Sequence, residues 1–224
     1  MKAGENRDQR REAGLRTRAR LLDAAVDLLA ERGEDGVTLR EVTDAARANI
    51  AAVSYHFGSL QALRDAAIEH ALERYLDAQE SAVSALGPES TLEEVAAAFS
   101  RPMISALADG GRDLDVLRIV SRAAIDPPPA WDRFDARFQR IRAIVVRRLR
   151  GRVPGVSESE LAFRARCAAG VVSWLALAPV GRELSGKPRN QIERRVVPVV
   201  AGALGGTIAA VQQFKHSLDE TQVS

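Results

Sequence analysis

The sequence predicts an all-α protein with a small N-terminal domain followed by a larger one. Hydrophobic residues make up 46% of the chain but aromatic residues only 4%, and no segment sustains the alternation of β-branched and polar residues that is typical of strands. Apolar residues instead recur at three- and four-residue intervals in several segments. The 224 residues are enough for two domains, since domains run at roughly 100 to 200 residues each.

The composition argues against several classes of protein. The single cysteine, Cys167, cannot form an intramolecular disulfide, and no secretory signal opens the chain, so we expect a cytoplasmic protein. The apolar stretch 196–211 contains Pro198 and three glycines and is shorter than the about 20 residues of a membrane-spanning helix. We expect no membrane segment.

Recognisable catalytic and metal-binding motifs are also missing from the sequence. The three histidines and one cysteine are scattered without metal-ligand spacing. Neither a phosphate-binding glycine loop nor a nucleophile elbow is found. We therefore expect no enzyme, no metal and no cofactor.

The distribution of charge is uneven along the chain. Residues 1–20 contain seven basic and three acidic side chains, a net charge of +4, which leaves −2 for the rest of a chain whose total is +2. Such a basic arm suits a polyanion, because lysine and arginine displace the counterions condensed on phosphates. The alternative is a disordered tail that only improves solubility.

The first three expected helices are closely spaced, and the second and third are shorter than the first. The first is expected over 17–32, where Leu22, Val26 and Leu29 recur at helical spacing, and Gly33 stands where a helix C-cap prefers glycine. Thr38-Leu39-Arg40-Glu41 has the form of a capping box and begins the second helix. Asn49, a good N-cap, opens the third only eleven residues later.

Further capping signals divide the rest of the chain. Gly58-Ser59 begins a long helix toward Leu86, Thr91 and Ser157 open capping boxes, and three consecutive prolines follow Asp126. Pro198 is expected to kink or delay the last helix. The later helices are expected at 91–109, 113–125, 130–150, 158–178 and 189–215.

The second and third helices, packed behind the first, predict a helix-turn-helix whose third helix can enter the major groove. In the third helix Ile50, Val53 and Phe57 share one stripe, which we expect to pack inward. The opposite face carries Ala51, Ala52 and Tyr55 and almost no charge, which favours contact with DNA over a solvated surface. Alternatively, Tyr55 and His56 only pack the junction with the next helix.

These segments resemble the TetR/AcrR family of bacterial regulators over residues 15–75. The residues that carry the resemblance are Leu21 to Ala25, Val37 to Val42, and the run Asn49 to Ser59 with its Tyr-His-Phe-Gly-Ser core. The resemblance implies a DNA-binding domain at 15–75 and an effector-binding and dimerisation domain at 76–216. It also implies that the following residues lie at or near DNA: Thr38, Arg40, Asn49, Ile50, Ala51, Ala52, Ser54, Tyr55 and His56.

Two positions depart from the pattern of this family. Arg47 stands in the turn where the family usually has glycine, so this turn either keeps φ negative or forces an arginine into the left-handed region. Leu60 stands where a phosphate-contacting lysine is usual, so one anchor on the DNA backbone is missing and the basic arm would have to compensate.

Beyond residue 75 the resemblance to the family is limited to a helical plan. A weaker likeness to the fatty-acid-responsive subgroup of this family rests on residues 49–59, 152–161 and Arg164. Large apolar side chains form stripes on several of the later helices, while the eight arginines between 130 and 152 are expected to be solvated. Each large side chain taken alone favours core packing. Because the family holds its effector between such helices, we expect these residues to wall a pocket for an apolar small molecule: Phe99, Met103, Leu107, Trp131, Phe134, Phe138, Val171 and Trp174.

Small residues are concentrated in the helices expected at 158–178 and 189–215. The resemblance implies that these two helices pair with their copies in a homodimer, which would present two recognition helices to half-sites about 34–36 Å apart. The alternative is that they pack within one chain.

The sequence therefore predicts a ligand-responsive regulator, a repressor released from a palindromic operator by an apolar small molecule. A second hypothesis, favoured by Arg47 and Leu60, is a protein-interaction module that no longer binds DNA specifically. Salt-dependent binding to a palindromic duplex would separate the two.

Overall fold

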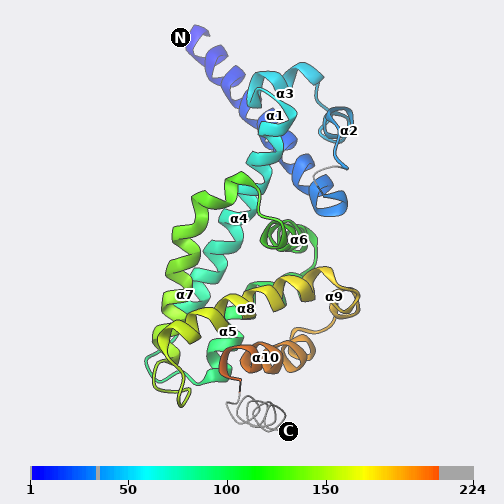
Figure 1. The fold of residues 1–224 in the computed structure, drawn as a ribbon. Coiled ribbons are helices and arrows are strands. Elements are labelled where there is room, and N and C mark those ends of the chain that lie inside the picture. Colours follow the sequence, from blue (N-terminus) through cyan, green and yellow to red (C-terminus); the bar gives the residue numbers. More distant parts are fainter. Residues whose placement is uncertain (1, 34–35, 207–224) are drawn as a thin grey trace, which may run out of the picture.

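The computed structural model describes residues 2–33 and 36–206, and every regular element in these ranges is a helix, which confirms the all-α prediction. The N-terminal unit contains α1 (Lys2–Arg32), α2 (Leu39–Ala45) and α3 (Ile50–Phe57), and α4 (Leu60–Ser84) leads from it into a larger body (Figure 1). That body contains α5 (Leu92–Asp109), α6 (Gly111–Ile125), the 3-10 helix η1 (Pro129–Phe134), α7 (Asp135–Leu149), α8 (Glu158–Leu177), α9 (Pro179–Leu184) and α10 (Arg189–Gly205).

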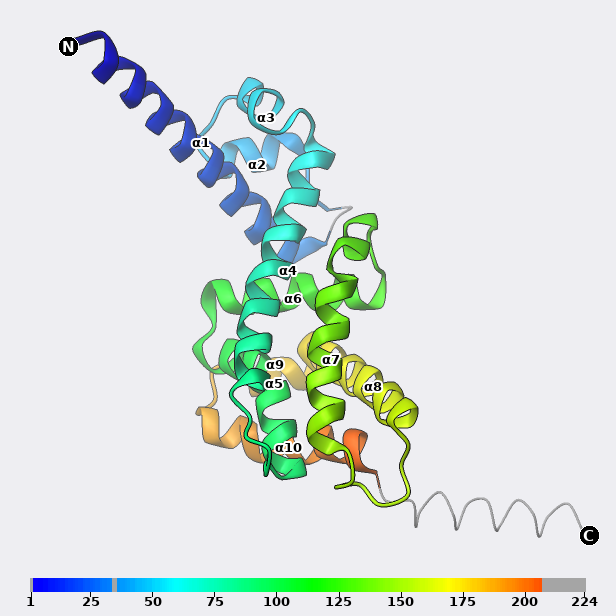
Figure 2. The same cartoon turned by 90° about the vertical axis from the view of Figure 1, so that its left-hand side faces the viewer.

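Two helices join the N-terminal unit to the body. Helix α4 packs on α1 and α3 at one end and on α5 and α7 at the other, while α6 packs on α1, α4 and α8. Figures 1 and 2 show α6 beside α4 and near the end of α1, where the two parts meet. Buried apolar residues run continuously from Leu21 in α1 through Leu72 in α4 to Ile192 in α10. A shift of α4 or α6 would therefore change the packing of the N-terminal unit.

Helix α1 is longer than predicted, because it begins at Lys2 instead of about residue 17. The apolar pattern used for the prediction starts only at Leu22, next to Leu21, the first buried residue that the structure describes in this helix. Before that, local contacts accompany the helix: Glu12 pairs with Arg16 at 2.9 Å and the Thr17 hydroxyl donates to the Ala13 carbonyl at 3.0 Å. Such contacts leave no apolar periodicity in a sequence.

The later helices differ from the prediction in three places. The helix expected at 130–150 is divided into η1 and α7, since the prolines before Trp131 start a tight turn in which its N–H donates to the Pro128 carbonyl. The short helix α9 was not predicted. Helix α10 begins at Arg189 and continues through Pro198, so this proline does not delay it, and the expected residues 207–215 lie outside the described ranges.

Arg47 adopts the left-handed conformation, with φ 49°, at the end of α2. The Ala48 N–H donates to the Thr43 carbonyl and the Arg47 N–H to the Asp44 carbonyl, at 2.9 and 3.1 Å. These two bonds form a Schellman motif, in which the position of Arg47 is most often glycine. The turn of the helix-turn-helix therefore keeps its usual geometry at the cost of backbone strain.

Replacing Arg47 with glycine is expected to raise the free energy of unfolding by about 0.5–1 kcal/mol, because relief of left-handed strain exceeds the entropy lost by ordering glycine. Urea titration of the full chain would measure it. Ala143→Gly, in an exposed and right-handed position of α7, should lower stability by a similar amount. Equal losses in both variants would contradict this account of Arg47.

Candidate DNA-binding surface and effector cavity

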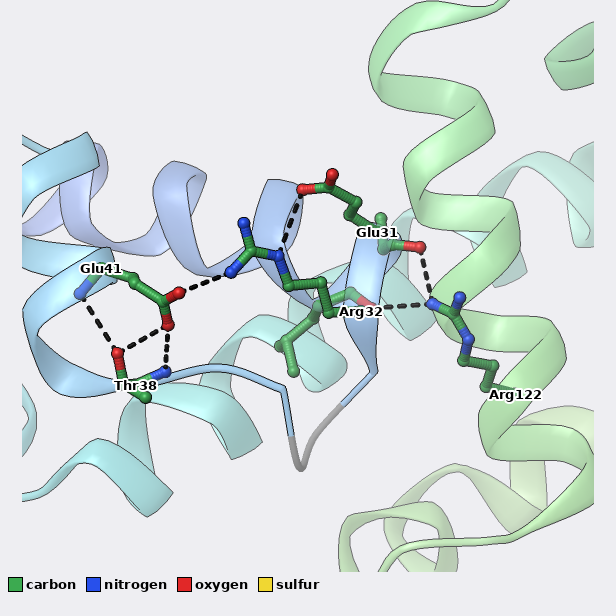
Figure 3. Close-up of polar contacts among 7 residues, drawn as sticks. Glu31, Arg32, Thr38, Glu41 and Arg122 are labelled. Atoms are coloured by element: carbon green, nitrogen blue, oxygen red, sulfur yellow. Dashed lines mark hydrogen bonds and ion pairs between the residues drawn. The ribbon is translucent and has the colours of Figure 1, made fainter.

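A complete capping box sets the position of α2. The Glu41 N–H donates to Thr38 Oγ1 at 3.4 Å, and the Thr38 N–H and hydroxyl donate to Glu41 Oε2 at 3.0 and 2.6 Å. Arg32, at the end of α1, donates to Glu41 Oε1 at 2.5 Å (Figure 3). The hydrogen bonds from Thr38, and then that from Arg32, lower the pKa of Glu41 and keep it ionised. Thr38 is thus held in place by α1 as well as α2.

Helix α3 presents a surface of small and neutral side chains to solvent. Asn49 caps it by accepting from the Ala51 N–H at 3.0 Å, and Val53 is the buried residue that holds it to the unit. Tyr55 is 84% exposed, and Ala51 and Ser54 are exposed beside it. No acidic side chain lies in this helix. Such a surface can approach base edges closely and donate to phosphates.

Two residues of α3 lie differently from the predicted stripe. Ile50, expected to pack inward, is 52% exposed, whereas Ala52, expected on the outer face, is half-buried against the core. Because the helix has only two turns, Val53 and Phe57 alone set its rotation about its own axis. That rotation turns the first residue of the helix, Ile50, outward. Ile50 therefore joins the exposed surface.

The basic arm is packed against α3. The Arg18 guanidinium lies 4.9 Å from the centre of the Phe57 ring. The ring of His56 is half-buried and edge-on to Tyr55, with centroids 4.8 Å apart. Arg40, in α2, is also exposed. Leu60 is half-buried against the core and has no donor for a phosphate.

A cavity of about 260 Å³ opens between α4, α5, α6, α7 and α8. Three of the expected pocket residues, Phe99, Trp131 and Phe138, line it. The rings of Trp131 and Phe138 are stacked, with centroids 4.4 Å apart and planes at 18°. The remaining lining residues are Tyr75, Gln79, Val120, Ser121, Ala124, Ile141, Arg142, Arg166, Ala169, Gly170 and Ser173.

The other five expected pocket residues do not line this cavity. Met103, Leu107 and Phe134 are buried in the core, and Val171 is half-buried against it. Trp174 is 59% exposed on the outer side of α8. A stripe of large apolar residues predicts the inner face of a helix. It does not tell which of these residues pack against other side chains and which line a cavity.

Polar residues of the cavity were missed by the sequence interpretation. Gln79 donates from Nε2 to the Phe99 carbonyl at 3.1 Å, and Arg142 and Arg166 enter the wall from α7 and α8. Arg142 was counted among the solvated arginines. No signal in the sequence separates it from its neighbours, because only the approach of α8 brings the two arginines together.

Helix α6 connects this cavity with the N-terminal unit. Val120, Ser121 and Ala124 line the cavity, whereas Arg122 between them points to α1 and donates to the carbonyls of Leu29 and Ala30 at 2.8 and 2.6 Å (Figure 3).

At the other end of α6, the two Nη atoms of Arg112 lie 3.1 Å from Asp23 and 3.5 Å from Asp27, both carboxylates of α1. One helix thus contacts both the cavity and the DNA-binding unit.

Replacing Arg122 with methionine keeps most of the aliphatic packing and removes the donors to the end of α1. The free energy of unfolding is expected to fall by about 1–3 kcal/mol, because a partly buried carbonyl loses a charged donor. Urea denaturation would measure the loss. The control Arg118→Met removes a 3.5 Å ion pair within α6 and should cost under about 1 kcal/mol. Equal losses would show that Arg122 adds nothing beyond a surface charge.

The outer face of α8 is apolar and uncovered by the described part of the chain. Phe163, Cys167, Gly170 and Trp174 recur at intervals of four, three and four residues, and all are exposed. On α10, Val199 and Gly202 are exposed as well. An exposed stripe of large and small apolar residues is typical of a protein interface.

Within the described ranges, no group of histidine, cysteine and acidic side chains could hold a metal ion. The same ranges contain no helix that is long and apolar enough to cross a membrane.

A three-helix unit with an exposed third helix, joined to a larger helical body, is the architecture of a helix-turn-helix DNA-binding protein with a second helical domain. Residues 21–67 match the model described as "Bacterial regulatory proteins, tetR family", and residues 97–206 match "Tetracyclin repressor-like, C-terminal domain". The chain belongs to the TetR family of transcriptional regulators.

Individual relatives are more distant. The chain is 29% identical over 79 residues to the probable HTH-type transcriptional regulator YttP of Bacillus subtilis, a match that spans 35% of this chain and 38% of that protein. A TetR-like regulator from Rhodococcus sp. RHA1 has a TM-score of 0.61 at 15% identity, over 85% of this chain and 97% of that one. AibR, solved in complex with isovaleryl coenzyme A and operator DNA, has a TM-score of 0.59 at 21% identity, over 85% and 98% of the two chains.

Proposed function

We propose that this protein is a dimeric repressor that leaves a palindromic operator when a small molecule enters the cavity between α4, α5, α6, α7 and α8. The observation that carries the proposal is the double role of α6, which lines that cavity and donates to the end of α1 through Arg122. It is a binding protein in this proposal and not an enzyme, and it acts in the cytoplasm, where bacterial DNA lies.

The DNA-binding surface in this proposal is the exposed side of α3 with the start of α2. Ala51 and Ser54 face base edges, Tyr55 and His56 donate to phosphates, and the basic arm adds charge. The residues assigned to it are Thr38, Arg40, Asn49, Ile50, Ala51, Ala52, Ser54, Tyr55 and His56. The proposed domain boundaries remain 15–75 and 76–216.

Release follows from a shift in population between two arrangements of α6 and α4. A ligand that binds one arrangement better draws the protein toward it, and the shift is limited by that difference in affinity. Both ends of α6 contact α1, through Arg112 and Arg122. A displacement of α6 therefore moves the two copies of α3 in the dimer out of register with their DNA half-sites. AibR was solved in complex with isovaleryl coenzyme A and operator DNA, which supports the proposal that a regulator with this fold binds a small molecule as well as DNA.

Dimerisation is proposed through α8 and α10, whose apolar outer faces are exposed in one chain. Pairing the stripe from Phe163 to Trp174 with its copy would bury it. A two-fold axis there presents two copies of α3 to half-sites one helical turn apart, about 34–36 Å.

The test is a fluorescence-anisotropy titration of the purified full chain with DNA upstream of its own gene, at two salt concentrations and against a scrambled duplex. Tight, selective binding that weakens steeply with salt is expected. Loss of affinity on adding a ligand that fills the cavity would support the release step. Equal affinity for scrambled DNA in every upstream fragment would favour a protein-interaction module, the candidate that Leu60 and strained Arg47 suggest.

A further inference from the structure

Two arginines from different helices share one small cavity. Arg142 of α7 is about three-quarters buried, and Arg166 of α8 is exposed, and both line the cavity. Burial lowers the pKa of Arg142, the nearby carboxylate of Asp135 raises it, and the charge of Arg166 lowers it further. The cavity therefore holds two positive charges close enough to repel each other.

The described residues compensate these charges only weakly. The nearest carboxylate to Arg142 is that of Asp135, at 3.8 Å, which is too long for a hydrogen bond. Within the described ranges Arg166 makes no ion pair, and its guanidinium lies 5.9 Å from the centre of the Phe163 ring. An anion between the two would replace this repulsion with two charge-assisted hydrogen bonds.

Other residues of the cavity wall are apolar. They include the stacked, half-buried Trp131 and Phe138 and the buried Phe99 and Ile141. The amide of Gln79 already donates to the backbone of α5. The cavity thus combines two cationic groups with aromatic and aliphatic walls, which fits a ligand with one anionic end and an apolar part.

We propose that the effector is a small amphipathic anion, with a carboxylate or phosphate group on Arg142 and Arg166 and an apolar chain against the Trp131–Phe138 stack. A volume of about 260 Å³ admits roughly nine groups the size of a water molecule. This corresponds to a chain of about six carbons with its head group. The inference rests on the proposed effector cavity and changes the expected ligand from apolar to anionic and apolar.

The probes are hexanoate, hexyl phosphate and neutral 1-hexanol, titrated calorimetrically into the full-length protein. At least one anion is expected to bind tenfold or more tightly than 1-hexanol, the equivalent of about one charge-assisted hydrogen bond. The two anions distinguish a carboxylate from a phosphate head group. Equal affinity of all three probes, or no binding by any at millimolar concentration, would overturn the proposal.

Matched variants locate the anionic group. Arg142→Gln and Arg166→Gln are each expected to weaken binding of the anion about tenfold and leave 1-hexanol unchanged. Arg147→Gln, at an exposed position of α7 outside the cavity, should change neither. An unchanged ratio of anion to alcohol affinity in both cavity variants would overturn the assignment, and the wild-type comparison decides the charge preference if a variant does not fold.

Operator binding is measured on the same protein in parallel. Selective DNA binding without any preference for anions would refute the ligand class and keep the proposed function. Preference for anions without selective DNA binding would refute the proposed function and keep the ligand class.

Discussion

Replacing Ala51 with glutamate is expected to weaken operator binding about 30-fold or more while leaving the fold intact. Ala51 is exposed in the first turn of α3, on the side proposed to face the groove. A carboxylate there would meet phosphates and base acceptors, a repulsion of about 1–3 kcal/mol in each of the two half-sites of a dimer. An acidic residue in the first turn favours the helix, so loss of binding would not reflect unfolding.

Fluorescence anisotropy with the operator would measure this loss. The matched control is Ala143→Glu, which adds the same charge at an exposed position in the middle of α7 and should change affinity less than about threefold. Similar losses in both variants would mean that overall charge decides affinity. Full affinity in Ala51→Glu would show that this side of α3 does not face DNA.

Replacing Trp174 with glutamate is expected to raise the dissociation constant of the dimer at least 100-fold. This tryptophan is 59% exposed in one chain and continues the apolar stripe of Phe163, Cys167 and Gly170. Truncating a buried tryptophan at the centre of an interface costs about 2–4 kcal/mol, and a carboxylate in its place adds the cost of burying a charge. Analytical ultracentrifugation over a range of protein concentrations would measure the change.

Cys167 provides a second readout, because it lies in the same stripe and is exposed in one chain. It should be alkylated slowly in the dimer and quickly in Trp174→Glu. The control Ile125→Glu changes a comparably exposed apolar residue at the end of α6 and should leave both the dimer and the alkylation rate unchanged. Rapid alkylation of the wild-type dimer, with no effect of Trp174→Glu on dissociation, would place the interface elsewhere.

The sequence by itself determined where α2, α3, α4, α5 and α8 begin, because their first residues are capped locally. Thr38 with Glu41, Asn49, Ser59 and Thr91 each cap the helix that was predicted to follow. At Ser157 only half of the predicted box forms, since Glu160 pairs with Arg164 at 2.8 Å instead of returning to the cap. The helix begins there nonetheless, because the serine alone satisfies a free N–H group.

The family could also be recognised from the sequence, because its signature lies in one short run of residues. The strain at Arg47 was one of two outcomes that the sequence left open, and the Schellman hydrogen bonds decided it. The length of α1 was not predictable from apolar periodicity, because its exposed part has none.

Only the tertiary structure decided what each apolar or charged side chain does once its helix has formed. Phe99 lines a cavity while Met103, one turn later, is buried in the core, and Trp174 faces outward. Arg122 caps α1 from a distance of 92 residues, and Arg142 meets Arg166 only because α7 and α8 pack together. Helical periodicity encodes which side of a helix is buried; the partner on that side depends on how distant helices pack, which no local pattern records.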